Sequence, residues 1–218
     1  MTVMTRGTDT RQRIIDAARD LLYTRSYGDV GVQAICERAG VKKGSFYHFF
    51  PSKQALTLAV IEEHLLISKR QILDQAFDPA QPPLERIRRF AARVYEVQKE
   101  LRDLTGQVLG CPFGNLALEM STQDETLRRE LQQVFRRLEG LLRDTVQEAV
   151  ARGELPGPVD AAATARAMLA YMEGVMLLAK TANDVELLRQ LMPALTRLRV
   201  TPAEADGAAA AAPAAQAS

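Results

Sequence analysis

The sequence contains no tryptophan and few aromatic residues or cysteines. Aromatic residues make up 6% of the 218 residues, and the two cysteines are Cys36 and Cys111. Two cysteines are too few for the disulfide framework of a small secreted protein. Thr, Arg and Asp crowd the first thirteen residues, so we expect no signal peptide. No apolar run reaches the roughly 18–20 residues that span a bilayer, so the sequence predicts a cytoplasmic protein without a membrane segment.

The sequence also lacks the motifs of common enzyme classes. Its two histidines, His48 and His64, lie in no metal-binding or nucleophile motif, and no glycine-rich phosphate loop follows a strand. Gly110-Cys111-Pro112 is not a C-x-x-C redox pair. We therefore expect no enzyme, no bound metal and no cofactor. A helical enzyme that uses glutamates and a helical scaffold protein are the alternatives.

Helix-forming residues dominate what is present. Leu, Ala, Arg, Glu and Gln are abundant, while glycine is sparse within the long segments. Helical apolar periodicity, interrupted by Gly and Pro breaks, predicts an all-α fold. The predicted helices run from 10 to about 26, over 32–38, 43–49, 52–76, 84–102 and 115–121, from beyond 125 to 152, and over 160–181 and 184–199.

Charge is distributed unevenly along the chain. Residues 1–56 carry nine Lys or Arg against five Asp or Glu, a net charge of +4, and the remainder carries a net charge of −3. A basic N-terminal quarter on a slightly acidic body indicates a module that binds a polyanion such as DNA.

A helix-turn-helix pattern lies within this basic quarter, over residues 31–53. Cys36 is the small residue where two helices cross, and Gly40 supplies the turn with a residue that tolerates positive φ. The spacing around the turn predicts residues that face the core, and the second helix presents a polar, basic face suited to the major groove. The residues predicted to face the core are Ile35, Ala39, Val41, Phe46 and Phe49.

The stretch A-G-V-x-x-G-x-x-Y-x-x-F-x-x-K over residues 39–53 resembles the signature of the tetracycline-repressor family. The resemblance implies that Tyr47 and Lys53 contact DNA phosphates. It implies that Lys43, Ser45 and His48 approach base edges, and that Lys42 contacts either a phosphate or a base. The DNA-binding residues implied in this way are Lys42, Lys43, Ser45, Tyr47, His48 and Lys53. The sequence departs from the family pattern at Gly31, where a capping Ser or Thr is usual, and at Phe49, where His or Tyr is common.

The resemblance extends over nearly the whole chain except its tail, and it implies a helical body that binds a ligand and forms dimers. The last two long helices, 160–181 and 184–199, are rich in apolar residues, so we expect them to form a four-helix bundle across a two-fold axis. Core helices of a monomer are the alternative. The predicted partners are a double-stranded operator, a small-molecule effector and a second copy of the chain.

A motif G-C-x-x-x-N-x-x-x-E, from Gly110 to Glu119, resembles a subgroup of the family in which some members sense electrophiles or oxidants through the cysteine. Cys111 precedes a helix whose N-terminal N–H groups can stabilise a thiolate, which makes it a candidate sensor. A small buried packing residue is the alternative. Met and aromatic residues at helical spacing are candidates for the pocket lining, although such stripes are also typical of cores. The candidate pocket residues are Tyr95, Cys111, Phe113, Met120, Phe135, Met168, Tyr171 and Met172.

The sequence thus predicts four parts. Residues 1–8 form a loose arm, residues 9–56 form the DNA-binding domain, and residues 57–202 form the ligand-binding and dimerisation domain. Residues 203–218 form an alanine-rich, disordered tail.

Overall fold

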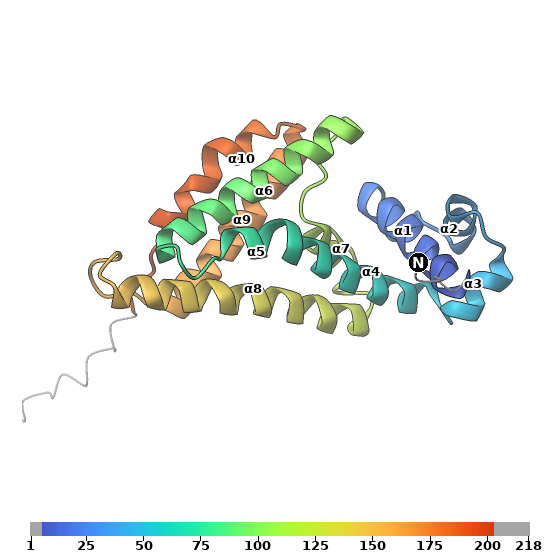
Figure 1. Ribbon diagram of the computed structural model, residues 1–218, viewed down its shortest axis with the longest axis horizontal. Helices are drawn as coiled ribbons and strands as arrows, with labels where there is room; N and C mark the ends of the chain where they lie inside the picture. Colours follow the sequence, from blue (N-terminus) through green and yellow to red (C-terminus); the bar gives the residue numbers. More distant parts are fainter. Residues whose placement is uncertain (1–5, 203–218) are drawn as a thin grey trace, which may run out of the picture.

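The computed structural model describes residues 6–202, and within this range the chain is helical without a strand, which confirms the all-α prediction. Figure 1 shows a small N-terminal head at one end of a larger helical body, with α4 running from one into the other. The predicted tail and residues 1–5 of the predicted arm lie outside the described residues. Residues 6–8 belong to the first helix, so the arm prediction is wrong for them.

The head consists of three helices around a small core. They are α1 (Arg6–Thr24), α2 (Val32–Ala39) and α3 (Lys43–Phe49). Ile14 and Ile15 from α1 pack with Ile35 from α2 and Phe46 from α3, and all four are almost completely buried. These residues recur at helical spacing because each helix turns one apolar stripe toward the others.

α4 (Lys53–Ser68) joins the head to the body. The Ser52 hydroxyl caps it by accepting a hydrogen bond from the Ala55 N–H at 3.0 Å. Leu56 and Val60 on this helix belong to the head core, whereas Ile61 packs with α7 and α8. The predicted division between residues 56 and 57 therefore falls inside a helix that both parts share. After Ser68 the chain continues as a π-helical turn (Lys69–Leu73) and α5 (Asp74–Ala76).

The body is built from α6 (Pro83–Thr105), α7 (Pro112–Met120), α8 (Glu125–Ala151) and α9 (Ala161–Ala182). α8 and α9 pack along each other, α6 packs against α8, and the C-terminal segment contacts both α6 and α9. α8 and α9 begin at Asp124 and Asp160, whose side chains accept hydrogen bonds from backbone N–H groups in the first turn of each helix.

The last segment differs from the predicted helix over 184–199. It forms α10 (Glu186–Leu191) and then a 3₁₀ helix (Met192–Arg197), with Pro193 at the start of the latter. Leu188, Met192 and Leu195 are buried against the chain's own body. Leu187, Leu191 and Leu198 are only partly buried, so part of the apolar surface that predicted a dimer helix here stays accessible. On α9, Leu177 and Leu178 are 52% and 56% exposed.

α9 is 22 residues long and apolar enough to cross a membrane by length and composition alone. The helix is not an uninterrupted apolar run, because Arg166, Glu173 and Lys180 interrupt it. Length and composition are weak evidence, since core helices also meet them. Met168, Met172, Val175 and Met176 of α9 are buried in the body core, as they would be in a core helix.

Candidate DNA-binding head and effector cavity

The turn between α2 and α3 has the geometry of a helix-turn-helix. Gly40 adopts φ 64°, and the N–H groups of Gly40 and Val41 donate to the carbonyls of Glu37 and Cys36 at 3.2 and 2.9 Å. A Cβ at Gly40 would lie 2.9 Å from the Arg13 guanidinium, which donates to the carbonyls of Ala39 and Gly40. Both the left-handed conformation and the close approach of Arg13 therefore favour glycine at position 40.

α3 presents most of the predicted DNA-binding side chains to solvent. Lys42, Lys43 and His48 are exposed, and Tyr47 is 55% exposed, while Ser45 is half-buried. Gly31 and Lys42 cap α2 and α3 without a side-chain hydrogen bond, as the departure at Gly31 predicted. Phe49, whose packing the sequence left open, packs partly against the head core.

Lys53 differs from the other predicted DNA contacts, because its ammonium group is already engaged. It donates to the carbonyls of Tyr27 and Val30 at 2.7 and 3.0 Å and lies 3.8 Å from the centre of the Tyr27 ring. Partial burial lowers the pKa of Lys53. The structure therefore gives Lys53 a role in holding the loop between α1 and α2, and leaves at most one ammonium N–H for a phosphate.

The same loop is fastened to the body by Glu119 at the end of α7. Its two carboxylate oxygens accept the backbone N–H groups of Tyr27 and Gly28, each at 2.7 Å. A second contact comes from Tyr23 on α1, whose hydroxyl donates to the carbonyl of Gly110 just before α7. Both ends of α7 thus lie against the head.

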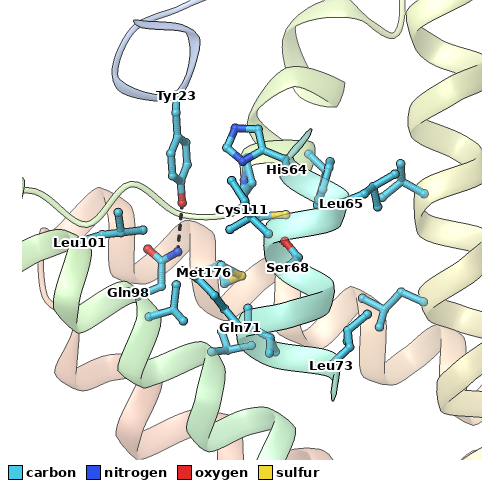
Figure 2. Close-up of a pocket in the computed structure, with 18 of the residues that line it drawn as sticks. Tyr23, His64, Leu65, Ser68, Gln71, Leu73, Gln98, Leu101, Cys111 and Met176 are labelled. Carbon is cyan, nitrogen blue, oxygen red and sulfur yellow. Dashed lines mark hydrogen bonds between the residues drawn. The ribbon is translucent and has the colours of Figure 1, made fainter. Parts of the chain in front are cut away.

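A cavity of about 470 Å³ lies where head and body meet, and α1, α4, α6, α7, α8 and α9 all contribute to its lining. Figure 2 shows Tyr23, His64 and Cys111 at one end and Gln71 and Leu73 at the other. A cavity of this size accommodates a small organic molecule. Because Tyr23 belongs to the head, a ligand in this cavity would contact the DNA-binding part directly.

The structure brings together half of the predicted pocket residues. Cys111, Phe113, Phe135 and Met172 line the cavity. The other four predictions are wrong for this cavity. They are Met120, which is buried between α7 and α8, Met168, which is fully buried in the body core, Tyr171, whose hydroxyl donates to the Leu191 carbonyl, and Tyr95, whose hydroxyl donates to Glu186.

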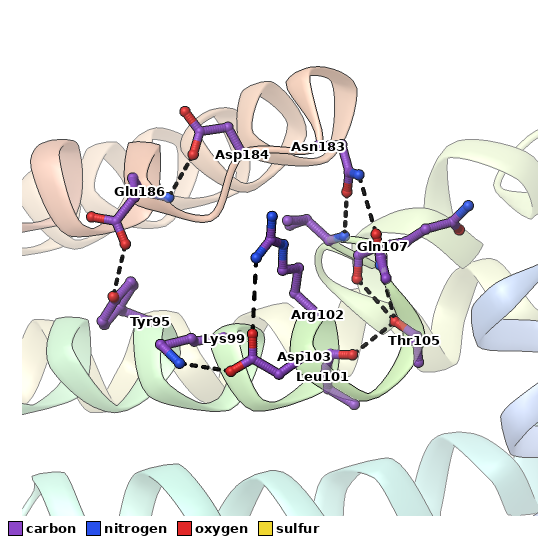
Figure 3. A network of polar contacts seen from close by, with 12 residues as sticks. Tyr95, Lys99, Leu101, Arg102, Asp103, Thr105, Gln107, Asn183, Asp184 and Glu186 are labelled. Carbon is purple, nitrogen blue, oxygen red and sulfur yellow. Dashed lines mark hydrogen bonds and ion pairs between the residues drawn. The ribbon is translucent and has the colours of Figure 1, made fainter.

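Figure 3 shows why Tyr95 cannot reach the cavity, since it lies on the side of α6 that faces α10. On the same side, Asn183 at the end of α9 accepts the Val108 N–H at 2.9 Å and donates to the Gly106 carbonyl at 3.2 Å. These contacts fix the segment that leads from α6 to Cys111.

Cys111 is the N-cap of α7, and its sulfur accepts the Gly114 N–H at 3.3 Å. The prediction that this position lowers the thiol pKa is wrong. Burial raises the pKa of Cys111 well above its usual value, and the nearby Glu173 carboxylate raises it further. The Gly114 N–H acts in the opposite direction but is the weaker influence. Cys111 is therefore held as a protonated thiol. Burial also raises the pKa of Cys36.

Several lining residues were not predicted from the sequence, namely Tyr23, His64, Gln98 and Glu173. Burial and the nearby Arg19 lower the pKa of His64 to about 4, so its imidazole is neutral near pH 7. Its ring contacts those of Tyr23 and Phe113 edge-on. Glu173 carried one signal in the sequence, since it is a lone carboxylate within the apolar stretch 167–178.

Comparisons with known proteins agree for both parts of the chain. Residues 14–60 match the family described as bacterial regulatory proteins, tetR family, and residues 83–195 match the tetracyclin repressor-like C-terminal domain. The transcriptional regulator AcuR of Cereibacter sphaeroides is 36% identical over 170 residues, which cover 78% of this chain and 75% of AcuR. The repressor DhaR of a Mycobacterium species is 28% identical and covers 85% of this chain and 89% of its own length.

Solved structures show the same architecture. A regulatory protein TetR from Rhodobacter sphaeroides superposes with a TM-score of 0.77 at 31% identity, covering 88% of this chain and 99% of that one. The reduced form of Escherichia coli NemR superposes with a TM-score of 0.71 at 24% identity, covering 89% and 100% of the two chains, which shows a shared fold.

Proposed function

The chain belongs to the tetracycline-repressor family of ligand-responsive, DNA-binding transcriptional regulators, and we propose that it is a cytoplasmic repressor that binds a palindromic operator as a homodimer. α3 supports this role, because it is solvent-exposed and carries Lys42, Lys43, Tyr47 and His48 beside a rigid turn. Two such helices related by a two-fold axis read two related half-sites.

The dimer is proposed to form through the outer face of α9. Leu177 and Leu178 are the exposed large apolar side chains on this helix, and α8 runs beside it. Contiguous exposed apolar surface on a soluble regulator favours a protein interface. Residues 184–199 are proposed to contribute through Leu187, Leu191 and Leu198, which are only partly buried within the chain.

A small molecule that enters the cavity is proposed to release the DNA. The single observation that carries this mechanism is that Tyr23 of the head is part of the cavity wall and is bonded to Gly110 at the start of α7. The other end of α7 holds the loop between α1 and α2 through Glu119. A ligand that favours another position of α7 would shift the spacing of the two heads away from the DNA-competent state.

The subgroup resemblance also supports an electrophile as effector, with Cys111 as its target. The protonated thiol favours a non-covalent ligand instead, because the thiolate is the reactive form. DNA release by an alkylating electrophile from wild type and Cys36→Ser, but not from Cys111→Ser, would establish the covalent mode.

A gel-shift assay on the DNA that flanks the gene tests the proposed function. We expect a saturable shift that an effector reverses. The shifted complex should contain two protein subunits per DNA duplex. A chain that shifts neither its flanking DNA nor a randomised duplex library would contradict the proposal.

A further inference from the structure

Glu173 is a buried carboxylate that lines the cavity and accepts few hydrogen bonds from other groups. Within residues 6–202, its Oε1 atom is buried without a hydrogen-bond partner. The Cys111 thiol is the neighbouring polar group, and the carboxylate raises the pKa of that thiol. Buried carboxylates normally gain two or more strong donors, so this one has unused capacity to accept hydrogen bonds.

The chain makes room for this carboxylate at the start of α7. A Cβ at Gly114 would lie 2.3 Å from Glu173 Oε2, so any other residue at this position would force the carboxylate to move. The Gly114 N–H meanwhile donates to the Cys111 sulfur. Glycine at position 114 therefore allows Glu173 to lie against the first turn of α7, where it borders the cavity.

Two other polar side chains that line the cavity, Tyr23 and Gln98, are already hydrogen-bonded. The Tyr23 hydroxyl donates to the Gly110 carbonyl, while the Gln98 amide donates to that carbonyl and accepts the Gly110 N–H. His64 is neutral because of its depressed pKa. Glu173 is thus the buried lining group with an unmet demand for a donor.

Within residues 6–202, no Lys or Arg forms an ion pair with Glu173 from the cavity side. Arg19 lines the cavity, but it is paired with Asp16 and Asp20. Arg137 also lines the cavity, but it is solvent-exposed on α8. Burial raises the pKa of Glu173, which is the consequence of a carboxylate without a charged partner.

We infer that the cavity binds a small amphipathic amine, whose ammonium group donates to Glu173 while its apolar part lies among the aliphatic and aromatic lining. The inference rests on the proposed function, since it specifies the effector of the same cavity. An ammonium supplies both the positive charge and the donors that Glu173 lacks. A carboxylate ligand would place a second anion beside Glu173 and should be excluded.

Three probes with one apolar body test this inference on the full chain without DNA. They are 4-phenylbutylamine, 4-phenylbutanol and 4-phenylbutyrate, and their affinities are measured by titration calorimetry. We expect the amine to bind at least about tenfold more tightly than the alcohol, because a hydrogen bond to a charged group is stronger than a neutral one. We expect the carboxylate to bind weakest. Equal affinities for amine and alcohol, or no binding of the amine, would overturn the inference.

The variant Glu173→Gln provides the second arm, with Glu100→Gln as its matched control. Glu100 also lines the cavity, but it is exposed on α6. Glu173→Gln should lose the preference for the amine and keep the affinity for the alcohol, whereas Glu100→Gln should behave as wild type. An equal loss in both variants would contradict a specific role for Glu173. The comparison of the three probes on wild type remains decisive if Glu173→Gln does not fold.

The outcome for the inference is separable from that for the proposed function. If the amine binds in the predicted order but does not release operator DNA, the inference stands and the proposed release mechanism fails. If other molecules release the DNA while the amine does not bind, the proposed function stands and the inference is overturned.

Discussion

At the level of single residues, the lysines of the head differ in how much of each ammonium group is free for DNA. Lys42 is exposed, whereas Lys53 donates to the carbonyls of Tyr27 and Val30. The family resemblance alone gives both residues a contact with DNA. The structure separates them, because a partly buried ammonium with two carbonyl partners contributes to the stability of the head.

Lys53→Ala should lower the free energy of unfolding by about 1–2 kcal/mol, since it leaves two carbonyls without their charged donor. Lys42→Ala serves as the control and should leave stability unchanged. It should also lower the slope of log K for DNA against log salt by about one, because one phosphate contact is lost. Urea unfolding and salt titrations of DNA binding measure the two effects. The assignment fails if Lys53→Ala is as stable as wild type.

His64 gives a second prediction, which concerns how the stability of the fold depends on pH. Its pKa is about 4 in the folded chain, below the unfolded value of 6.5, so the unfolded chain takes up the proton first as pH falls. The contribution of neutral His64 to the free energy of unfolding is therefore fully present above pH 6.5 and is lost progressively toward pH 4. The loss attributable to this residue is up to about 3 kcal/mol.

His64→Gln removes this titration, so the unfolding free energy of the variant should fall less between pH 6.5 and 4 than that of wild type. Carboxylates titrate in the same range, and they contribute equally to both proteins. Parallel curves for the two proteins would show that His64 is not buried in its neutral form.

At the level of elements, α7 connects the cavity to the head. Cys111 caps its first turn beside the cavity, and Glu119 near its end holds the loop between α1 and α2. Charge-assisted hydrogen bonds from two backbone N–H groups make Glu119 a strong anchor. A displacement of α7 would therefore move the loop between α1 and α2 directly, because Glu119 binds that loop.

Glu119→Gln should weaken this anchor, because an amide offers one acceptor oxygen in place of two. The Tyr27 and Gly28 amides should exchange hydrogen at least several-fold faster, and DNA affinity should fall. Glu62→Gln is the control, since Glu62 is exposed on α4. Hydrogen exchange measured by mass spectrometry checks the result, and unchanged protection of residues 27 and 28 would argue against the anchor.

The elements of the head could be predicted closely from the sequence, whereas the cavity could not. Helices predicted over 32–38 and 43–49 correspond to α2 and α3, because the Gly40 turn and the apolar spacing are local signals. Cavity residues such as Tyr23 and Gln98 come from α1 and α6, which are far apart in the sequence and come together only in the folded chain. The end of the chain was predicted as one long helix, and its 3₁₀ geometry follows from packing around Pro193.

At the scale of the whole molecule, the proposed function requires two copies of the chain. Leu177→Glu and Leu178→Glu each place a charge on the exposed face of α9 and should shift the dimer toward monomer. Leu66→Glu is the matched control, because Leu66 is 49% exposed on α4 and away from α9. Light scattering at micromolar concentration measures the mass. Dimers that persist in both α9 variants would exclude this interface.

The proposed function requires two copies of α3 to bind one operator. DNase I footprinting of the DNA that flanks the gene tests it most directly, with wild type and with Lys43→Ala. We expect protection of two related half-sites separated by about one helical turn or more, with the symmetry of an imperfect palindrome. Lys43→Ala should weaken protection of both half-sites alike. Protection of one asymmetric half-site, or no protection at any concentration, would contradict the proposed function.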